Sequence, residues 1–202
     1  MSDPWTSWRN GVFGDPYMVW HDGPDFTRLV GLARSTPAEV ARMLTAGVEA
    51  GDPLAAQSIA ALADADLVPD DAEALLRAVA PTATELMLVR VAQALHVLTG
   101  EESWATPIAT VLTSEAFWGV RIDAAMALAA FTPTPALLDA LARGVRDDEY
   151  LVRYHSANTL LRYAGDSKEI SDHPDLFDKV TSDADAAGRA ELADQLTSAI
   201  KP

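Results

Sequence analysis

The sequence predicts an all-α protein, built as a solenoid of about four stacked helical hairpins, and three observations support this. A Val-Arg signature recurs at intervals of 31 and 32 residues. Alanine, the best helix former, is abundant throughout the repeated region. Long alternating runs of valine, isoleucine and threonine, which would indicate strands, are absent. A period in this range is typical of proteins in which each helical hairpin packs on its neighbours.

The repeated element is a Val-Arg pair, found at Val89-Arg90, Val120-Arg121 and Val152-Arg153. A small residue follows each Arg by four positions and an aliphatic residue by seven, so these side chains share one face of a helix. A weaker copy at Leu54-Ala55 lacks the Arg. We expect the residues at the two offsets to be core: Ala94, Val97, Ala125, Leu128, Ala157, Leu160 and, in the weaker copy, Ile59 and Leu62.

Start and stop signals define the expected helices of this region. Ser35-Thr36-Pro37 resembles an N-cap with Pro in the first turn, and Asp52-Pro53 restarts the chain in the same way. Gly100 is a C-terminal signal after a long helix. These signals predict four hairpins, with helices over 35–46, 53–63, 70–79, 84–98, 104–112, 116–130, 135–145 and 149–163.

Residues 1–35 differ from the repeats. They hold three of the five tryptophans, together with further aromatic residues, glycines and prolines. This mixture predicts an irregular segment with one short helix near 25–33. Its simpler interpretation is a cap over the exposed apolar face of the first hairpin. The alternative is an aromatic contact surface for a partner, because tryptophan and tyrosine are strong interface anchors.

We expect a single domain over residues 1–202. Its parts are the aromatic segment 1–35, the repeats 36–165 and a C-terminal cap, 166–202. The cap begins with a polar linker and continues with two helices near 175–181 and 184–200. These helices carry charge on their outer faces, as terminal repeats of solenoids do.

The chain is strongly acidic, with 30 acidic and 15 basic residues and a net charge of −15. Binding to nucleic acid requires clustered Lys and Arg, and this sequence has no such cluster and only three lysines. We therefore expect no nucleic-acid ligand and a protein partner that is basic. No apolar run approaches the ~20 residues that span a membrane, and the N-terminus lacks a secretory signal. These features predict a cytoplasmic protein, which we expect to be a monomer.

The repeats resemble the HEAT-repeat family, specifically the short HEAT-like repeats of phycobilin-lyase type. The family pattern is an acidic turn followed by V-R-x-x-A-A-x-A-L, and residues 120–128 fit it at nearly every position. The stretch from Asp147 to Leu160 also fits, whereas the copy at Val89-Arg90 is looser. The resemblance covers residues 36–165.

This resemblance implies a right-handed α-α superhelix. It also implies that Arg90, Arg121 and Arg153 bridge to acidic groups of adjacent repeats, which makes them structural rather than catalytic. The family pattern is specific for a fold and says little about function.

The sequence contains no motif for catalysis, for a cofactor or for a metal. It has no cysteine, and none of its histidines (His21, His96, His155 and His173) lies at i, i+4 from another or within H-E-x-x-H. No P-loop, G-x-G-x-x-G or G-x-S-x-G occurs. Repeated His-Glu pairs, as in HEAT-like di-iron hydroxylases, are absent, and the charge is wrong for a HEAT-like DNA glycosylase. We therefore expect a non-enzymatic protein without a cofactor.

A binding role must use the surface, and the resemblance places the second helix of each hairpin on the concave side. Positions two, five and nine after the signature Arg share a face that is distinct from the core stripe. From this face we select Gln57, Asp64, Asp123, Met126, His155, Asn158 and Arg162 as candidate partner-binding residues. The candidate aromatic contacts are Trp5, Trp8, Trp118 and Tyr154. The alternative is an ordinary solvated groove.

These features favour a protein-interaction module. A narrower hypothesis is an acidic immunity or antitoxin-like protein that neutralises a basic partner, motivated by the small size, the charge and the lack of catalytic motifs. The preference for Arg over Lys, with abundant Ala and Asp, is typical of a bacterium with a GC-rich genome. Two alternatives stay open: a lyase-like or other enzyme accessory that acts through the concave groove, and a regulatory scaffold subunit of a larger assembly.

Overall fold

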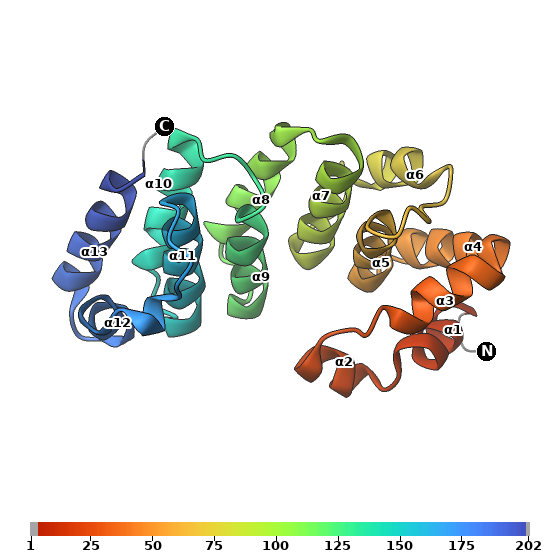
Figure 1. Ribbon diagram of the computed structural model, residues 1–202, viewed down its shortest axis with the longest axis horizontal. Coiled ribbons are helices and arrows are strands. Elements are labelled where there is room, and N and C mark those ends of the chain that lie inside the picture. Colours follow the sequence, from red (N-terminus) through yellow and green to blue (C-terminus); the bar gives the residue numbers. More distant parts are fainter. Residues whose placement is uncertain (1–3, 201–202) are drawn as a thin grey trace. The chain divides into compact units, whose positions relative to one another are not determined.

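The computed structural model describes residues 4–200, which confirm an all-α protein. This range contains thirteen α-helices and two short 3-10 helices, and no strand is present within it (Figure 1). The contacts divide the chain into two compact units, Met1–Glu101 and Glu102–Pro202. We call them the N-terminal and the C-terminal unit and describe each by itself. The expected single domain stays a prediction.

The described part of the N-terminal unit holds seven helices, and the most extensive contact among them joins α5 and α7. Within it α4 packs on α5, α6 packs on α7, and α5 also packs on α7. The bounds are α1 Pro4–Phe13, α2 Pro16–Asp22, α3 Thr27–Ser35, α4 Pro37–Glu49, α5 Pro53–Ala63, α6 Ala72–Val79 and α7 Glu85–Thr99.

The C-terminal unit holds six α-helices in the same pairwise arrangement. Within it α8 packs on α9, α10 on α11 and α12 on α13, and the pairs are joined by contacts of α9 with α11 and of α8 with α10. The bounds are η1 Glu102–Trp104, α8 Ala105–Leu112, α9 Trp118–Leu128, α10 Pro135–Val145, α11 Tyr150–Tyr163, η2 Ile170–Asp172, α12 Pro174–Thr181 and α13 Ala186–Ser198. No helix in the described range is long and apolar enough to cross a bilayer.

The start and stop signals from 35 onward place the helices correctly to within a few residues. The carboxylate of Asp52 caps α5 by accepting a hydrogen bond from the backbone N–H of Leu54 at 2.9 Å. Gly100 ends α7 in the left-handed conformation, with φ at 71°. Local capping chemistry therefore determines these boundaries.

The prediction of an irregular N-terminal segment is wrong, because its described residues form α1 and α2 as well as α3. Pro4 and Pro16 stand at helix starts, where proline is favoured, and Gly11 is accommodated inside α1. Trp5 is buried, and its Nε1 donates a hydrogen bond to Oδ2 of Asp52 at 2.7 Å. This long-range contact stabilises α1 against the local breaker signals.

The core follows the signature stripe closely in α5, α9 and α11. Ile59, Leu128 and Leu160 are buried, as are the small residues Ala125 and Ala157. In α7 the prediction for Val97 is wrong: its side chain is 49% exposed, whereas Val91 and Leu95 are buried instead. Helix α7 therefore keeps Ala94 in the core, as predicted, but exposes the position seven residues after the Arg.

Arg121 and Arg153 each join the helix on which they lie to the turn before it and to the next hairpin. Arg121 donates to the carbonyl of Ala116 at 2.6 Å and to Oδ1 of Asp147 at 2.9 Å. Arg153 is fully buried and donates to the carbonyls of Asp147, Asp148 and Val180, at 3.0, 2.7 and 2.7 Å. It also donates to Oδ1 of Asp183 at 2.6 Å. The Arg153 guanidinium thus donates through all three of its nitrogen atoms, whereas that of Arg121 donates through its two terminal nitrogens.

A further copy of the signature, which the Val-Arg pattern did not predict, lies in α13. Arg189 is buried and donates to the carbonyls of Ser182 and Asp183 at 2.9 and 2.8 Å, in the turn before its helix. Ala193 and Leu196 follow it by four and seven positions and are buried. The residue before Arg189 is Gly188 rather than a valine, which hid the copy.

Candidate partner-binding surface

Helices α9 and α11 form the surface that carries most of the predicted partner-binding residues. Two hydrogen bonds set their relative register: the Thr159 hydroxyl donates to the carbonyl of Ala125 at 2.8 Å, and the Tyr163 hydroxyl donates to that of Leu128 at 2.5 Å. Burial raises the pKa of Tyr163 to about 12, so this phenol stays protonated at neutral pH and keeps its donor. The α9–α11 face is defined here by Phe117, Asp123, Met126, Leu151, Tyr154, His155 and Arg162.

Large apolar side chains are exposed on this face. Phe117, Met126 and Leu151 are 60%, 53% and 39% exposed. The ring of Phe117 lies against that of Trp118, with centroids 4.9 Å apart, and above Gly119, which has no side chain to displace it. Exposed apolar side chains that gather on one surface are typical of a protein-interaction site.

Charged groups surround His155 at the middle of the face. Burial lowers the pKa of His155, while Glu169 and Asp123 act in the opposite direction and Arg162 adds to the lowering. These influences place the predicted residues Asp123, His155 and Arg162 in one electrostatic neighbourhood. They also add Glu169, from the segment after α11, which the sequence did not single out.

Tyr154 and Asn158 do not project freely, because the segment after α11 folds back over them. The Tyr154 hydroxyl donates to Oε2 of Glu169 at 2.8 Å. Asn158 is buried, and its Oδ1 accepts a hydrogen bond from the backbone N–H of Ile170 at 2.7 Å. The prediction that Asn158 contacts a partner is therefore corrected: its amide holds the chain segment that covers it. Tyr154 stays half-buried at the edge of the face.

Of the remaining predicted residues, four belong to the N-terminal unit and one, Trp118, lies beside Phe117. Gln57 and Asp64 belong to α5 and its C-terminus in the N-terminal unit, where Gln57 is half-buried and Asp64 exposed. Trp5 is buried and Trp8 half-buried, with the two rings 5.6 Å apart. Trp5 is thus a capping residue of its unit, and the expected partner contact of Trp5 is corrected. Trp118 is half-buried beside Phe117.

Sequence reasoning missed Phe117 and Leu151, the two apolar residues of the face that precede the signature Arg. Leu151 stands two positions before Arg153 and Phe117 four positions before Arg121, whereas only positions after the Arg were counted. A helical-wheel count in both directions would have found Leu151. Phe117 lies in the turn before α9, outside the helical register, so no helical spacing in the sequence predicts its exposure.

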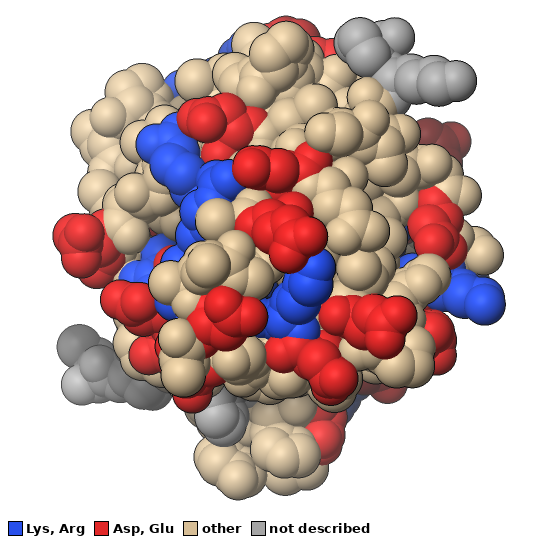
Figure 2. Space-filling view, turned by 90° about the vertical axis from the view of Figure 1, so that its left-hand side faces the viewer, with Lys and Arg blue, Asp and Glu red and all other residues tan. Residues whose placement is uncertain are grey.

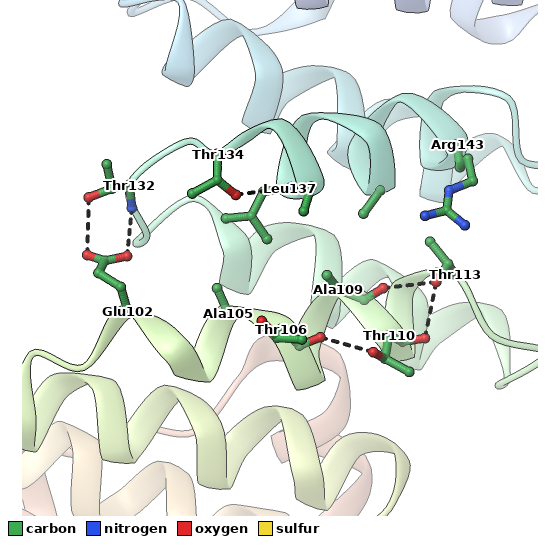
Figure 3. A pocket seen from close by; sticks show the side chains of 12 residues that line it. Glu102, Ala105, Thr106, Ala109, Thr110, Thr113, Thr132, Thr134, Leu137 and Arg143 are labelled. Carbon is green, nitrogen blue, oxygen red and sulfur yellow. Dashed lines mark hydrogen bonds between the residues drawn. The ribbon is translucent and has the colours of Figure 1, made fainter. Parts of the chain in front are cut away.

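A groove of about 460 Å³ lies elsewhere in the C-terminal unit, between α8 and α10 (Figure 3). Alanine and threonine side chains line most of it. Glu102 accepts hydrogen bonds from the backbone N–H and the hydroxyl of Thr132 at 3.0 and 3.1 Å, and the hydroxyl groups of Thr110 and Thr113 donate to carbonyls of their own helix. Since these polar groups are already paired, the groove offers few convergent donors to a small substrate.

The α9–α11 face presents exposed apolar side chains together with a carboxylate, a guanidinium and one imidazole. Among the residues that the structure describes, no group of three His, Asp or Glu side chains could hold a metal ion.

Comparison of the chain with protein-family models, with curated proteins and with solved structures finds no match.

Proposed function

We propose that this protein is a HEAT-like, right-handed α-α solenoid with helical caps at both ends. Two features support the proposal. Helices pair in sequence order, and second helices of successive pairs contact each other within each unit. The side chains of Arg121 and Arg153 donate to Asp147 and Asp183, which lie in the next pair, as the HEAT-like pattern implies.

The α9–α11 face is, in this proposal, the site where a non-enzymatic interaction module binds a basic protein. The observation that carries the proposal is the exposure of Phe117, Met126 and Leu151 on a face that also carries Asp123 and Glu169. Apolar anchors supply binding free energy, and surrounding carboxylates select a partner that carries Lys or Arg.

The basic residues near α12 and α13 do not oppose this selection of a basic partner, because carboxylates pair with them. In Figure 2, the basic side chains form separate patches, and acidic side chains lie beside each of them. Lys179 pairs with Glu191 at 3.1 Å and Arg146 with Asp194 at 2.7 Å, so these cations are already compensated. The chain as a whole carries a net charge of −15, which attracts a cationic partner over long range.

The narrower proposal is that the basic partner is a toxin and that this protein is its immunity protein. Small size, strong negative charge and a rigid helical surface are the properties that fast neutralisation of a cationic protein requires. Steering by charge makes capture fast and makes it weaken with salt.

The test is affinity purification from cells that produce the protein, at low salt. We expect one dominant basic protein, which is lost when Met126 and Leu151 are both replaced by serine and retained when Val97, a similarly exposed apolar residue of α7, is replaced by serine. Growth arrest by the purified partner and its rescue by this protein would support immunity.

Recovery of no basic protein at low salt would reject the proposal. A small molecule or metal seen by native mass spectrometry would favour the enzyme-accessory alternative.

A further inference from the structure

Helix α2 exposes its apolar side chains instead of burying them. Tyr17 and Met18 are 63% and 51% exposed, the first and fourth most exposed of the large apolar side chains described. Within the N-terminal unit α2 packs lightly, against α1, and Figure 1 shows it at the outer side of the α1–α3 group. The aromatic residues around it behave differently: Trp8, Phe13 and Phe26 form a chain of edge-to-face contacts.

The flanking glycines set α2 apart from the packed helices. Gly14 and Gly23 border it with φ at 89° and 80°, and a Cβ added at either would meet no atom within 4 Å. These residues therefore serve the turns into and out of α2 rather than close packing. A seven-residue helix gains little stability by itself. Its caps hold it: Asp15 accepts from the backbone N–H of Tyr17 at 2.9 Å, and Pro16 stands in the first turn.

Between Arg9 of α1 and Arg28 of α3, the part of the chain that contains α2 has only acidic charged side chains. The segment from Asn10 to Thr27 contains Asp15, Asp22 and Asp25 and no Lys or Arg. All three aspartates are exposed. Exposed apolar side chains with carboxylates nearby are complementary to an apolar surface that is bordered by cations.

We propose that α2 is a second docking element, which binds a basic amphipathic helix of a protein partner. Tyr17 and Met18 pack on the apolar stripe of that helix, and Asp15 and Asp22 face its Lys or Arg side chains. This element is independent of the α9–α11 face, because it is built from different residues in the other unit.

The test measures binding of a defined probe to the full chain by fluorescence anisotropy. The probe is a labelled amphipathic peptide of about 18 residues, or five helical turns, composed of leucine and lysine at helical spacing. Met126→Ser and Leu151→Ser are present in every variant, so that the α9–α11 face does not contribute. We expect salt-sensitive binding that weakens by about tenfold or more when Tyr17 and Met18 are both replaced by serine. The matched variant Val97→Ser should bind as well as the background protein.

Charge is tested separately, with Asp15→Asn and Asp22→Asn together, because asparagine is as good an N-cap as aspartate and keeps α2 capped. This pair should weaken binding and reduce its dependence on salt. Unchanged melting temperatures would show that the variants are folded. Equal binding by the Tyr17/Met18 variant, or equal binding of a leucine–glutamate peptide, would overturn the proposal. A dimer of the unaltered chain that dissociates in that variant would also overturn it, because the occupant would then be a second copy.

Discussion

The signature arginines Arg121 and Arg153 are structural residues, which connect their helices to the preceding turn and to the next helix pair. A guanidinium presents five donors in a fixed plane, which suits it to several carbonyls and a carboxylate at once. Arg153 donates in this way to three carbonyl groups and to Asp183, although Asp183 itself is largely exposed. The carbonyl contacts, rather than the ion pair, therefore account for most of its contribution to stability.

Replacing Arg153 tests this division. We expect Arg153→Ala to lower the free energy of unfolding by about 3–5 kcal/mol, because it leaves buried carbonyl groups unpaired. Asp183→Ala should cost less than about 1 kcal/mol, as exposed ion pairs do. Urea denaturation monitored by circular dichroism measures both. Equal losses in the two variants would show that the ion pair carries the contact. Arg143→Ala, in an exposed pair with Asp139, is the control and should be near neutral.

His155 gives a pH dependence whose sign follows from its lowered pKa. Burial is the main cause, so the folded protein binds the His155 proton less readily than the unfolded chain does. Its contribution to stability is fully present above the unfolded pKa of about 6.5 and is lost as the pH falls toward the lower folded pKa. We expect His155→Gln to lose less stability than the unaltered protein between neutral and mildly acidic pH. Unfolding free energies from urea titrations at a series of pH values measure this, and parallel curves for the two proteins would contradict it.

At the scale of helices, the N-terminal aromatics divide into two groups. Helix α1 is held by Trp5, which packs on Gly47 of α4 and donates to Asp52, whereas α2 exposes Tyr17 and Met18. A Cβ at Gly47 would lie 2.7 Å from the Trp5 ring, so glycine is required for this approach. The burial of Trp5 thus supports the capping alternative for α1, and partner contact is what we propose for α2.

Substitution of Trp5 tests the capping role of α1. We expect Trp5→Ala to destabilise the protein by about 3–5 kcal/mol, as removal of a buried tryptophan does, and Trp5→Phe to cost less because it keeps most of the packing. Trp8→Ala, at a half-buried site, should have a smaller effect. Thermal melting measures the loss. An unchanged melting temperature with impaired partner binding would instead assign Trp5 to a contact surface.

At the scale of the whole molecule, the dominant property is a net charge of −15. Carboxylates in excess repel one another in the compact state and are screened by salt. Part of this excess lies between α5 and α6, where Asp64, Asp66 and Asp70 are exposed. Asp66 has φ at 57°, a conformation that asparagine also tolerates.

Salt should therefore stabilise this protein. We expect the melting temperature to rise by roughly 2–4 °C between low and physiological ionic strength, the shift that about 1 kcal/mol gives at this chain length. The triple variant Asp64→Asn, Asp66→Asn and Asp70→Asn should show a smaller rise. Differential scanning calorimetry in a sodium chloride series measures both. A melting temperature that falls with salt would mean that favourable ion pairs outweigh the repulsion.

The sequence by itself determined that the chain is helical, where its helices from residue 35 onward begin and end, and which faces of α5, α9 and α11 are core. These properties depend on caps and on helical spacing, which act within a few residues. It also pointed to Asp123, Met126, His155 and Arg162 as residues of one surface.

Only the tertiary structure decided what depends on contacts between distant segments. The hydrogen bond from Trp5 to Asp52 stabilises α1, although glycine and proline in this segment predicted an irregular structure. The segment that contains Ile170 folds back over α11 and buries Asn158. The exposure of Val97 and of Tyr17 likewise depends on which neighbours are present. Burial is a property of the packed molecule, because the same helical face can be covered in one repeat and open in the next.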